Sequence, residues 1–315
     1  MAEEAQSPPP YLSVVIPVYN EEENLVELQA RLTATLERTG WSWEVVYVDD
    51  GSRDRSWDIL EGFHRRDREH VRLVRFNRNY GQHMAVLAGF ERVRGRVVVT
   101  LDADLQNPPE EIPRLVNKLE EGYDVVGGWR RNRRDSWLRK LPSWVMNRLT
   151  SRVVGVDLKD YGCMLRAYRR EVVDAMNACQ ETSSFIPALA NTFARDVIEI
   201  PVAHAERSGG RSKYGPLRLL RLNFDLMTGF SALPIQLVSL LGSLVALAGL
   251  AFGVFLFVRR LIVGPEVEGV FTLFAILFVF VGLQILGVGL IGEYVGRIYR
   301  EVRRRPRYII RETRD

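Results

Sequence analysis

The residues of this sequence best placed to do chemistry are two aspartates one residue apart, Asp102 and Asp104, in the stretch VTLDADLQNPPEEIP. They follow an apolar run, so a buried strand is expected to end on two like charges. Two carboxylates this close share either a proton, as in aspartic proteases, or a cation. The neighbouring residues do not suit a protease, whereas hard divalent cations favour carboxylate oxygens. The pattern therefore predicts a site for Mg²⁺ or Mn²⁺, completed by the oxygens of a diphosphate.

Four β-rich runs must position these residues, at LSVVIPV, WEVVYVD, VRLVRF and RVVVTLD, with helical patterns between them. This alternation predicts a largely parallel sheet covered by helices on both faces. Ligands of such sheets bind outside the carboxyl ends of the strands. Acids and amides stand at those ends: Asn20, Glu21, Asp49, Asp50, Asn77, Asn79, Asp102 and Asp104. No glycine-rich phosphate loop follows the first strand, which disfavours dehydrogenases and P-loop enzymes.

The next part of the chain continues the α/β pattern and carries a basic run. We expect a helix near 110–121, with Pro108 and Pro109 ending the fourth strand and starting that helix. A strand at YDVVGGW, a strand and helix within 157–176, and a strand at VIEIPV follow. The run that begins at Arg130, RRNRRDSWLRK, is either a solvated loop or a flap that meets phosphates.

Two long stretches without a charged side chain, 231–258 and 269–292, predict a membrane hairpin. A helix of roughly 20 residues crosses a hydrocarbon core about 30 Å thick, and both stretches are longer than that. A pair of buried core helices is the alternative, but such helices seldom stay uncharged for so long. Residues 216–228 have the spacing of an amphipathic helix lying at the membrane surface.

Basic residues near the spans predict their orientation. Only Arg259 and Arg260 lie in the connection, whereas many precede the first span or follow the second: Arg211, Lys213, Arg218, Arg221, Arg297, Arg300, Arg303, Arg304, Arg305 and Arg307. Both termini are therefore expected on the cytoplasmic side. The net charge of +4 could suggest nucleic acid. Since the arginines gather beside the spans and in one loop, we expect membrane lipid and phosphate as partners, and no nucleic acid.

Several stretches together resemble glycosyltransferase family 2, with its GT-A fold: SVVIPVYNEEENL, VDDGSRD, NRNYGQHMAVLAGF and LDADLQNPPEEIPRLV. With the hairpin, they resemble its polyprenyl-phosphate branch. More narrowly, DYGCMLRAYRREVVDAM, FIPALANTFARDVIEIPVAHAER and GLIGEYVGRIYREVRRRPRY are similar to enzymes that load 4-deoxy-4-formamido-L-arabinose onto undecaprenyl phosphate. The resemblance runs from about Leu12 to Tyr308. It implies a UDP-4-deoxy-4-formamido-L-arabinose donor, lipid A modification and polymyxin resistance, the bacterial cytoplasmic membrane, and a homo-oligomer, a tetramer in similar enzymes.

The composition of the chain and the resemblance together predict a domain organisation. Residues 1–10 would be a disordered lead, 11–205 a cytoplasmic GT-A catalytic domain, and 206–230 a mobile basic segment with the interfacial helix. The membrane hairpin would occupy 231–292 and a basic cytoplasmic tail 293–315.

Roles carried over from the family fall into four groups. The nucleotide would be held by Pro17, Tyr19, Glu21, Asp49, Asp50, Asp102 and Ala103, and the metal by Asp102, Asp104 and Gln106. The diphosphate and the acceptor phosphate would meet Arg130, Arg207, Arg211 and Lys213. The acidic residue near the acceptor would be Asp160, with Asp157 second, although Cys163, Met164 and Leu165 depart from the Asp-Phe-Arg stretch of some relatives.

Structural roles remain open as alternatives for single residues, and other functions remain open for the whole chain. Glu21 could be a first-turn helix acid and Asp50 a turn former, while His83 is expected to start or pack a helix. The donor could instead be UDP-glucose or another hexose. A processive polysaccharide synthase fits less well, because no Gln-x-x-Arg-Trp motif is present. A membrane-tethered nucleotide-binding scaffold without activity is the alternative from another class.

Overall fold

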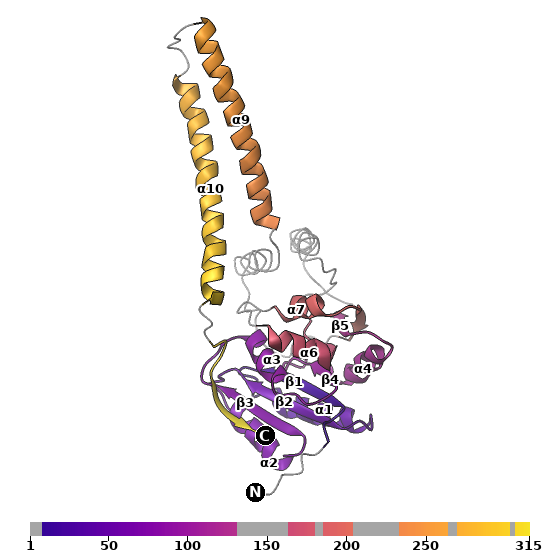
Figure 1. Ribbon diagram of the computed structural model, residues 1–315. Helices are drawn as coiled ribbons and strands as arrows, with labels where there is room; N and C mark the ends of the chain where they lie inside the picture. The colour runs from indigo at the N-terminus through magenta and orange to yellow at the C-terminus, as the bar shows by residue number, and fades with distance from the viewer. Residues whose placement is uncertain (1–7, 131–162, 180–184, 204–232, 264–269, 303–305) are drawn as a thin grey trace, which may run out of the picture. The chain divides into compact units, whose positions relative to one another are not determined.

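The structure, a computed structural model, describes residues 8–130, 163–179, 185–203, 233–263, 270–302 and 306–315 (Figure 1). Asp157, Asp160, Arg207, Arg211, Lys213 and the interfacial helix expected at 216–228 lie outside these residues. The chain divides into two compact units, one of residues 1–215 with 306–315 and one of residues 216–305.

The first unit contains an eight-stranded sheet in the order β7-β5-β6-β4-β1-β2-β3-β8. The strands are β1 Leu12–Val18, β2 Trp43–Asp49, β3 Val71–Phe76, β4 Val97–Thr100, β5 Val125–Arg130, β6 Arg166–Arg169, β7 Val197–Val202 and β8 Ile310–Arg314. β1 pairs in parallel with β2 and β4, β2 with β3, and β5 with β7. The pairs β4–β6, β5–β6 and β3–β8 are antiparallel. The mostly parallel α/β sheet expected from the sequence is confirmed.

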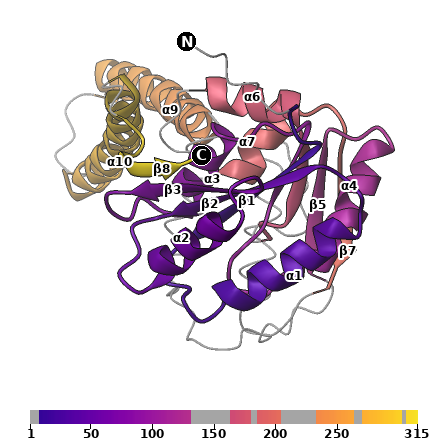
Figure 2. The same ribbon diagram turned by 90° about the horizontal axis from the view of Figure 1, so that it is seen from below.

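Helices cover both faces of this sheet (Figure 2). α1 (Leu25–Glu37), α2 (Ser56–Arg66) and α4 (Ile112–Glu120) share one apolar cluster with alternate residues of β1, Leu12, Val14 and Ile16. α3 (Gln82–Phe90), α6 (Arg170–Ala178) and α7 (Ile186–Phe193) share the opposite cluster with Val15. Successive side chains of a strand point to opposite faces, so one apolar run serves both layers.

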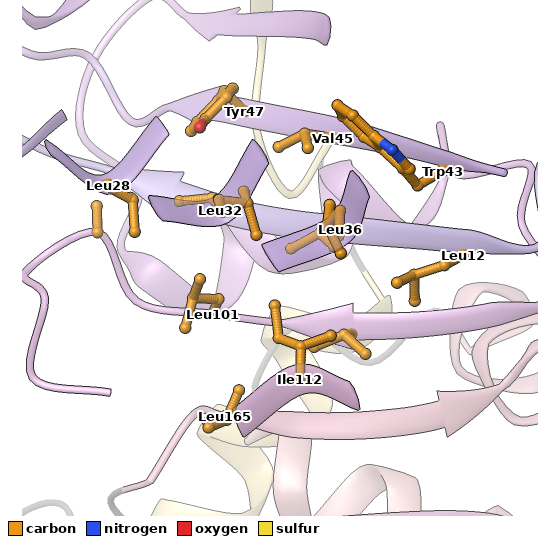
Figure 3. Close-up of a cluster of buried hydrophobic side chains, with 14 of the residues drawn as sticks. Leu12, Leu28, Leu32, Leu36, Trp43, Val45, Tyr47, Leu101, Ile112 and Leu165 are labelled. Atoms are coloured by element: carbon orange, nitrogen blue, oxygen red, sulfur yellow. The ribbon is translucent and has the colours of Figure 1, made fainter. Parts of the chain in front are cut away.

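The α1 side of the core shows how the helical pattern meets the strand pattern (Figure 3). Leu28, Leu32 and Leu36 recur four residues apart, lie on one face of α1 and are fully buried. They pack in the cluster that also holds Tyr47 and Leu101 from the sheet side. This packing holds the α1 layer against the strands whose ends carry the polar residues.

Three features differ from the sequence expectations. β4 ends at Thr100, so Pro108 and Pro109 do not end it: Pro108 caps the short 3₁₀ helix η1 (Pro109–Glu111), which leads into α4. The expected strand end and the expected helix start are therefore separated by an irregular loop, which carries both aspartates. α7 was not anticipated. Nor was β8, which lies in the stretch expected to be a tail and adds a strand to the edge of the sheet at β3.

The second unit contains two long apolar helices, α9 (Leu233–Val263) and α10 (Val270–Val302), which run side by side (Figure 1). A Cβ atom added at Gly249 would lie 3.2 Å from the ring of Phe280, so the two helices approach closely there. Windows of mean hydropathy 2.2 in α9 and 1.6 in α10 are long and apolar enough to cross a membrane. Both helices extend beyond the uncharged stretches that predicted them.

Candidate active site

The parallel register brings the predicted polar residues to one edge of the sheet. Val18, the last residue of β1, pairs with Asp49, the last residue of β2, and Val15 pairs with Thr100 at the end of β4. The loops that follow these strands therefore leave the same edge side by side. Pro17 lies within β1 and pairs with Val48.

Asp49 is fully buried at the end of β2. Its Oδ1 accepts a hydrogen bond from the Ser52 amide at 3.0 Å, and Nε of Arg75 lies 3.3 Å from Oδ2. Burial raises the pKa of Asp49, and the bonds from Ser52 and the charge of Arg75 oppose that shift. Among the described residues, none donates a well-aligned hydrogen bond to Oδ2. A buried acceptor with spare capacity is suited to a ligand N–H or O–H group.

Asp50 faces a different partner, the loop between β3 and α3. Its Oδ1 accepts a hydrogen bond from the Tyr80 amide at 2.6 Å, and its Oδ2 accepts one from the Gly81 amide at 2.9 Å. Burial raises the pKa of Asp50 to about 6 despite these two bonds. Gly81 has φ +99° and precedes α3. Asp50 thus fixes the entry to α3, a long-range contact distinct from both roles considered from the sequence, nucleotide contact and turn formation.

Reciprocal contacts join the loops after β1 and β2. The Asn20 amide donates to Ser52 Oγ at 3.0 Å, and the Arg53 amide donates to Asn20 Oδ1 at 2.8 Å. Asn20 has φ +56°, a left-handed conformation that Asn adopts more readily than most residues. The Glu21 amide donates to Ser56 Oγ at 2.9 Å. These bonds hold Tyr19, between Val18 and Asn20, beside the β2–α2 loop.

The two aspartates of the Asp-x-Asp stretch lie in the loop after β4 and are partly exposed, whereas Ala103 and Leu105 are buried. Asp102 Oδ1 accepts a hydrogen bond from Gln82 Nε2 at 2.5 Å, and Asp104 Oδ1 accepts one from the Gln106 amide at 3.1 Å. Leu105 has φ +60°, an uncommon conformation for a bulky side chain. The left-handed turn lets Leu105 enter the core while Asp104 and Gln106 stay at the surface.

This loop offers a divalent cation a partial set of oxygen ligands. Within the described residues, no group of three His, Cys, Asp or Glu side chains could hold a metal ion. Mg²⁺ commonly uses one or two carboxylates and takes its other oxygens from water and substrate phosphates. Asp102 and Asp104, with Gln106 beside them, fit that mode of binding. Among the described residues, no further acidic, histidine or cysteine side chain joins the two aspartates in a metal site.

A cavity of about 240 Å³ lies at the ends of β1, β2 and β3. It is lined by Tyr19, Gly51, Ser52, Arg53, Arg75, Phe76, Asn77, Arg78, Asn79 and Arg311. Tyr19 was expected at a ligand site and Asn77 and Asn79 at strand ends, whereas the arginines of this lining were not expected. Arg75 lies inside a β-rich run and Arg311 is distant in sequence, so no local pattern marks them as site residues. Arg130, expected near phosphate, is the last residue of β5.

The comparisons with known proteins agree with this architecture. Residues 13–176 match the family described as Glycosyl transferase family 2. A crystal structure of a mycobacterial protein has 21% sequence identity and a TM-score of 0.50, and the match covers 70% of this chain and 73% of that one. For mannosyl-3-phosphoglycerate synthase from Rubrobacter xylanophilus the identity is 15% and the TM-score 0.50, with 68% and 71% covered. At these identities the likeness shows a shared fold.

Proposed function

The chain belongs to glycosyl transferase family 2, and we propose that it transfers 4-deoxy-4-formamido-L-arabinose from a UDP-sugar to undecaprenyl phosphate at the bacterial cytoplasmic membrane. The observation that carries the UDP-sugar part is the Asp-x-Asp loop after β4, at the same sheet edge as buried Asp49 and the cavity beyond it. The two apolar helices support a lipid acceptor. The identity of the sugar is supported by the sequence resemblance.

In this proposal the donor lies along the edge of the sheet. Asp49 Oδ2 accepts a hydrogen bond from the uracil N–H, and Tyr19 lines the cavity together with Arg75, the ion-pair partner of Asp49. The diphosphate reaches the loop with Asp102 and Asp104, where Gln82 orients one carboxylate. A bound Mg²⁺ or Mn²⁺ would neutralise charge that develops on the departing diphosphate.

The reaction is a single displacement at the anomeric carbon. An oxygen of the acceptor phosphate forms a bond to that carbon, the bond from the carbon to the β-phosphate oxygen breaks, and its electron pair leaves with UDP. Attack from the face opposite UDP inverts the anomeric configuration. Because a phosphate monoester loses its second proton near pH 6, the attacking oxygen is largely ionised at neutral pH. We therefore assign Asp160, with Asp157 as second candidate, to orienting the acceptor as well as to a base role.

The donor is tested with the full chain in detergent and undecaprenyl phosphate. Formation of the lipid-linked sugar is measured by mass spectrometry with UDP-4-deoxy-4-formamido-L-arabinose and, in parallel, with UDP-glucose. We expect turnover with the first donor only. Turnover with UDP-glucose and none with the formamido-arabinose donor would reject the sugar while leaving the reaction class intact.

Asp104→Asn separates an enzyme from a nucleotide-binding scaffold. We expect it to lower turnover about 100-fold or more, because charge stabilisation at the leaving group is lost. Asp58→Asn is the matched control: it makes the same charge change on an exposed position of α2 and should leave turnover unchanged. Chelation with EDTA should have the effect of Asp104→Asn. Full activity of Asp104→Asn would refute the assigned role of the loop.

A further inference from the structure

The chain returns to the first unit after α10, and its last strand reaches the ligand edge of the sheet. β8 pairs antiparallel with β3: Arg314 lies opposite Leu73, Glu312 opposite Arg75, and Ile310 opposite Phe76. The register skips Arg311, which has no partner on β3. An extra residue of this kind forms a β-bulge, and bulges commonly redirect a side chain next to a functional site.

Contacts on both sides of the bulge fix β8 in place. Before it, the ring of Tyr308 stacks on Phe76 with the centroids 4.8 Å apart, and the Asn77 amide donates to the Ile309 carbonyl at 3.1 Å. After it, Arg75 Nη1 donates to Glu312 Oε1 at 3.3 Å. Phe76, Asn77 and Arg75 also line the cavity. The residues that hold β8 on both sides of the bulge therefore also line the cavity.

A further ion pair ties β8 to the helix layer. Arg314 Nη2 lies 3.2 Å from Glu61 of α2 and 3.0 Å from Glu312. Glu312 and Asp49 both bind Arg75, so the positive charge of Arg75 is compensated on two sides. Arg311 lines the cavity from an exposed position. A guanidinium there offers donor groups to a ligand that carries acceptor oxygens.

We propose that Arg311 binds the nucleoside part of the sugar donor by donating hydrogen bonds to a carbonyl oxygen of its base. This deepens the proposed function and rests on it. The cavity lies at the ends of β1 to β3, whereas Asp102 and Asp104 follow β4, on the other side of β1. From β4 to β3 there are three strand spacings, about 14 Å. A diphosphate at the aspartates therefore directs the base, and not a phosphate, toward Arg311.

In this proposal two side chains match the hydrogen-bonding groups on one edge of a pyrimidine base. Arg311, in the cavity lining, supplies a donor for a carbonyl oxygen. Asp49, which is fully buried and pairs with the lining residue Arg75, supplies an acceptor for a ring N–H. An adenine base has no carbonyl oxygen, so it lacks the acceptor that this proposal assigns to Arg311. Arg311 is thus a specificity-determining residue that the strand after α10 adds to the site formed by the strands of the family domain.

Arg311→Gln tests the proposal in the full chain in detergent, with Arg68→Gln as the matched control on an exposed position outside the cavity. Dissociation constants are measured for UDP and uridine, and pyrophosphate is measured as a competitor of UDP. We expect Arg311→Gln to weaken UDP and uridine about tenfold each, and to leave pyrophosphate unchanged. In turnover the loss should appear in KM with little change in kcat, because the contact is equal in ground and transition states.

Several results would overturn the proposal. Unchanged UDP affinity would do so, as would a loss shared by pyrophosphate, which would place Arg311 on a phosphate. Arg68→Gln must keep wild-type affinity, and the thermal unfolding midpoint must show that Arg311→Gln is folded. If the wild type binds no UDP, the proposed donor is wrong, and the same pair of variants is compared with CDP, dTDP and GDP, whose bases each carry a carbonyl oxygen. The inference then stands only if Arg311→Gln weakens the base that binds, and it falls if none binds.

Discussion

Gly51 offers the sharpest test of how the candidate site is built. This glycine follows Asp50, lines the cavity and has φ +71°. A Cβ atom at this position would lie 2.5 Å from the carbonyl carbon of Arg78 and 2.8 Å from the amide nitrogen of Asn79. Both contacts are to backbone, so no side-chain rotation relieves them. Since ordinary contact begins at 3.4 Å, the β3–α3 loop would have to retreat by about 0.9 Å.

Gly40→Ala is the matched control for Gly51→Ala. Gly40 has φ +69°, and a Cβ atom there meets nothing within 4 Å. The left-handed backbone alone costs an alanine about 1 kcal/mol, which is the loss of unfolding free energy expected for Gly40→Ala. Displacing packed atoms adds about 1–3 kcal/mol, so Gly51→Ala should lose about 2–4 kcal/mol.

The functional effect separates the two variants further. A shift of almost 1 Å in a wall of the donor cavity should lower kcat/KM about 100-fold for Gly51→Ala, whereas Gly40→Ala should turn over normally. Unfolding by denaturant and turnover with the UDP-sugar are measured on both variants in detergent. Equal stability and equal turnover of the two variants would refute the close approach on which the argument depends.

Two further predictions concern ionisable groups that are shielded from solvent. Glu44 is fully buried, with Arg94 Nε at 3.0 Å and Arg72 Nε at 3.1 Å. Glu44→Gln should therefore lower the unfolding free energy by about 3 kcal/mol, whereas the exposed control Glu37→Gln should leave it unchanged. Denaturant titration measures both variants. Burial lowers the pKa of His83 to about 4 in the folded state, below the unfolded value near 6.5. The contribution of His83 to stability is therefore complete above pH 6.5 and falls as the pH decreases toward 4. The unfolding free energy should be about 1–2 kcal/mol lower at pH 5 than at pH 7.5, and His83→Phe should remove this difference. An equal loss in the wild type and in His83→Phe would contradict the shielding of His83 from solvent.

Asp50 illustrates how a residue can be found from sequence while its contact is not. Its place after β2 follows from the β-rich run WEVVYVD, and it lies at the expected edge of the sheet. The direction of its carboxylate depends on the Tyr80 and Gly81 amides, thirty residues away in the chain. Two adjacent aspartates thus take separate tasks: Asp49 faces Arg75, and Asp50 holds the start of α3.

The sequence by itself determined the features that depend on local pattern. β-branched runs define β1 to β4, and fourfold spacing of leucines defines the buried face of α1. The polar residues that end these runs, Asp49 and Asp102 among them, could be assigned to one edge because parallel strands must align their carboxyl ends. The two uncharged stretches predicted α9 and α10 by length and composition alone.

Only the tertiary structure decided which distant segments complete the site. IRETR, the sequence of β8, is short and mostly charged, and it becomes a strand because β3 presents an unpaired edge and Phe76 offers a stacking surface to Tyr308. The bulge at Arg311, the left-handed turn at Leu105 and the approach of Gly51 to Arg78 are likewise outcomes of packing. Each joins residues far apart in the chain or depends on the space that neighbours leave, and no local window contains that information.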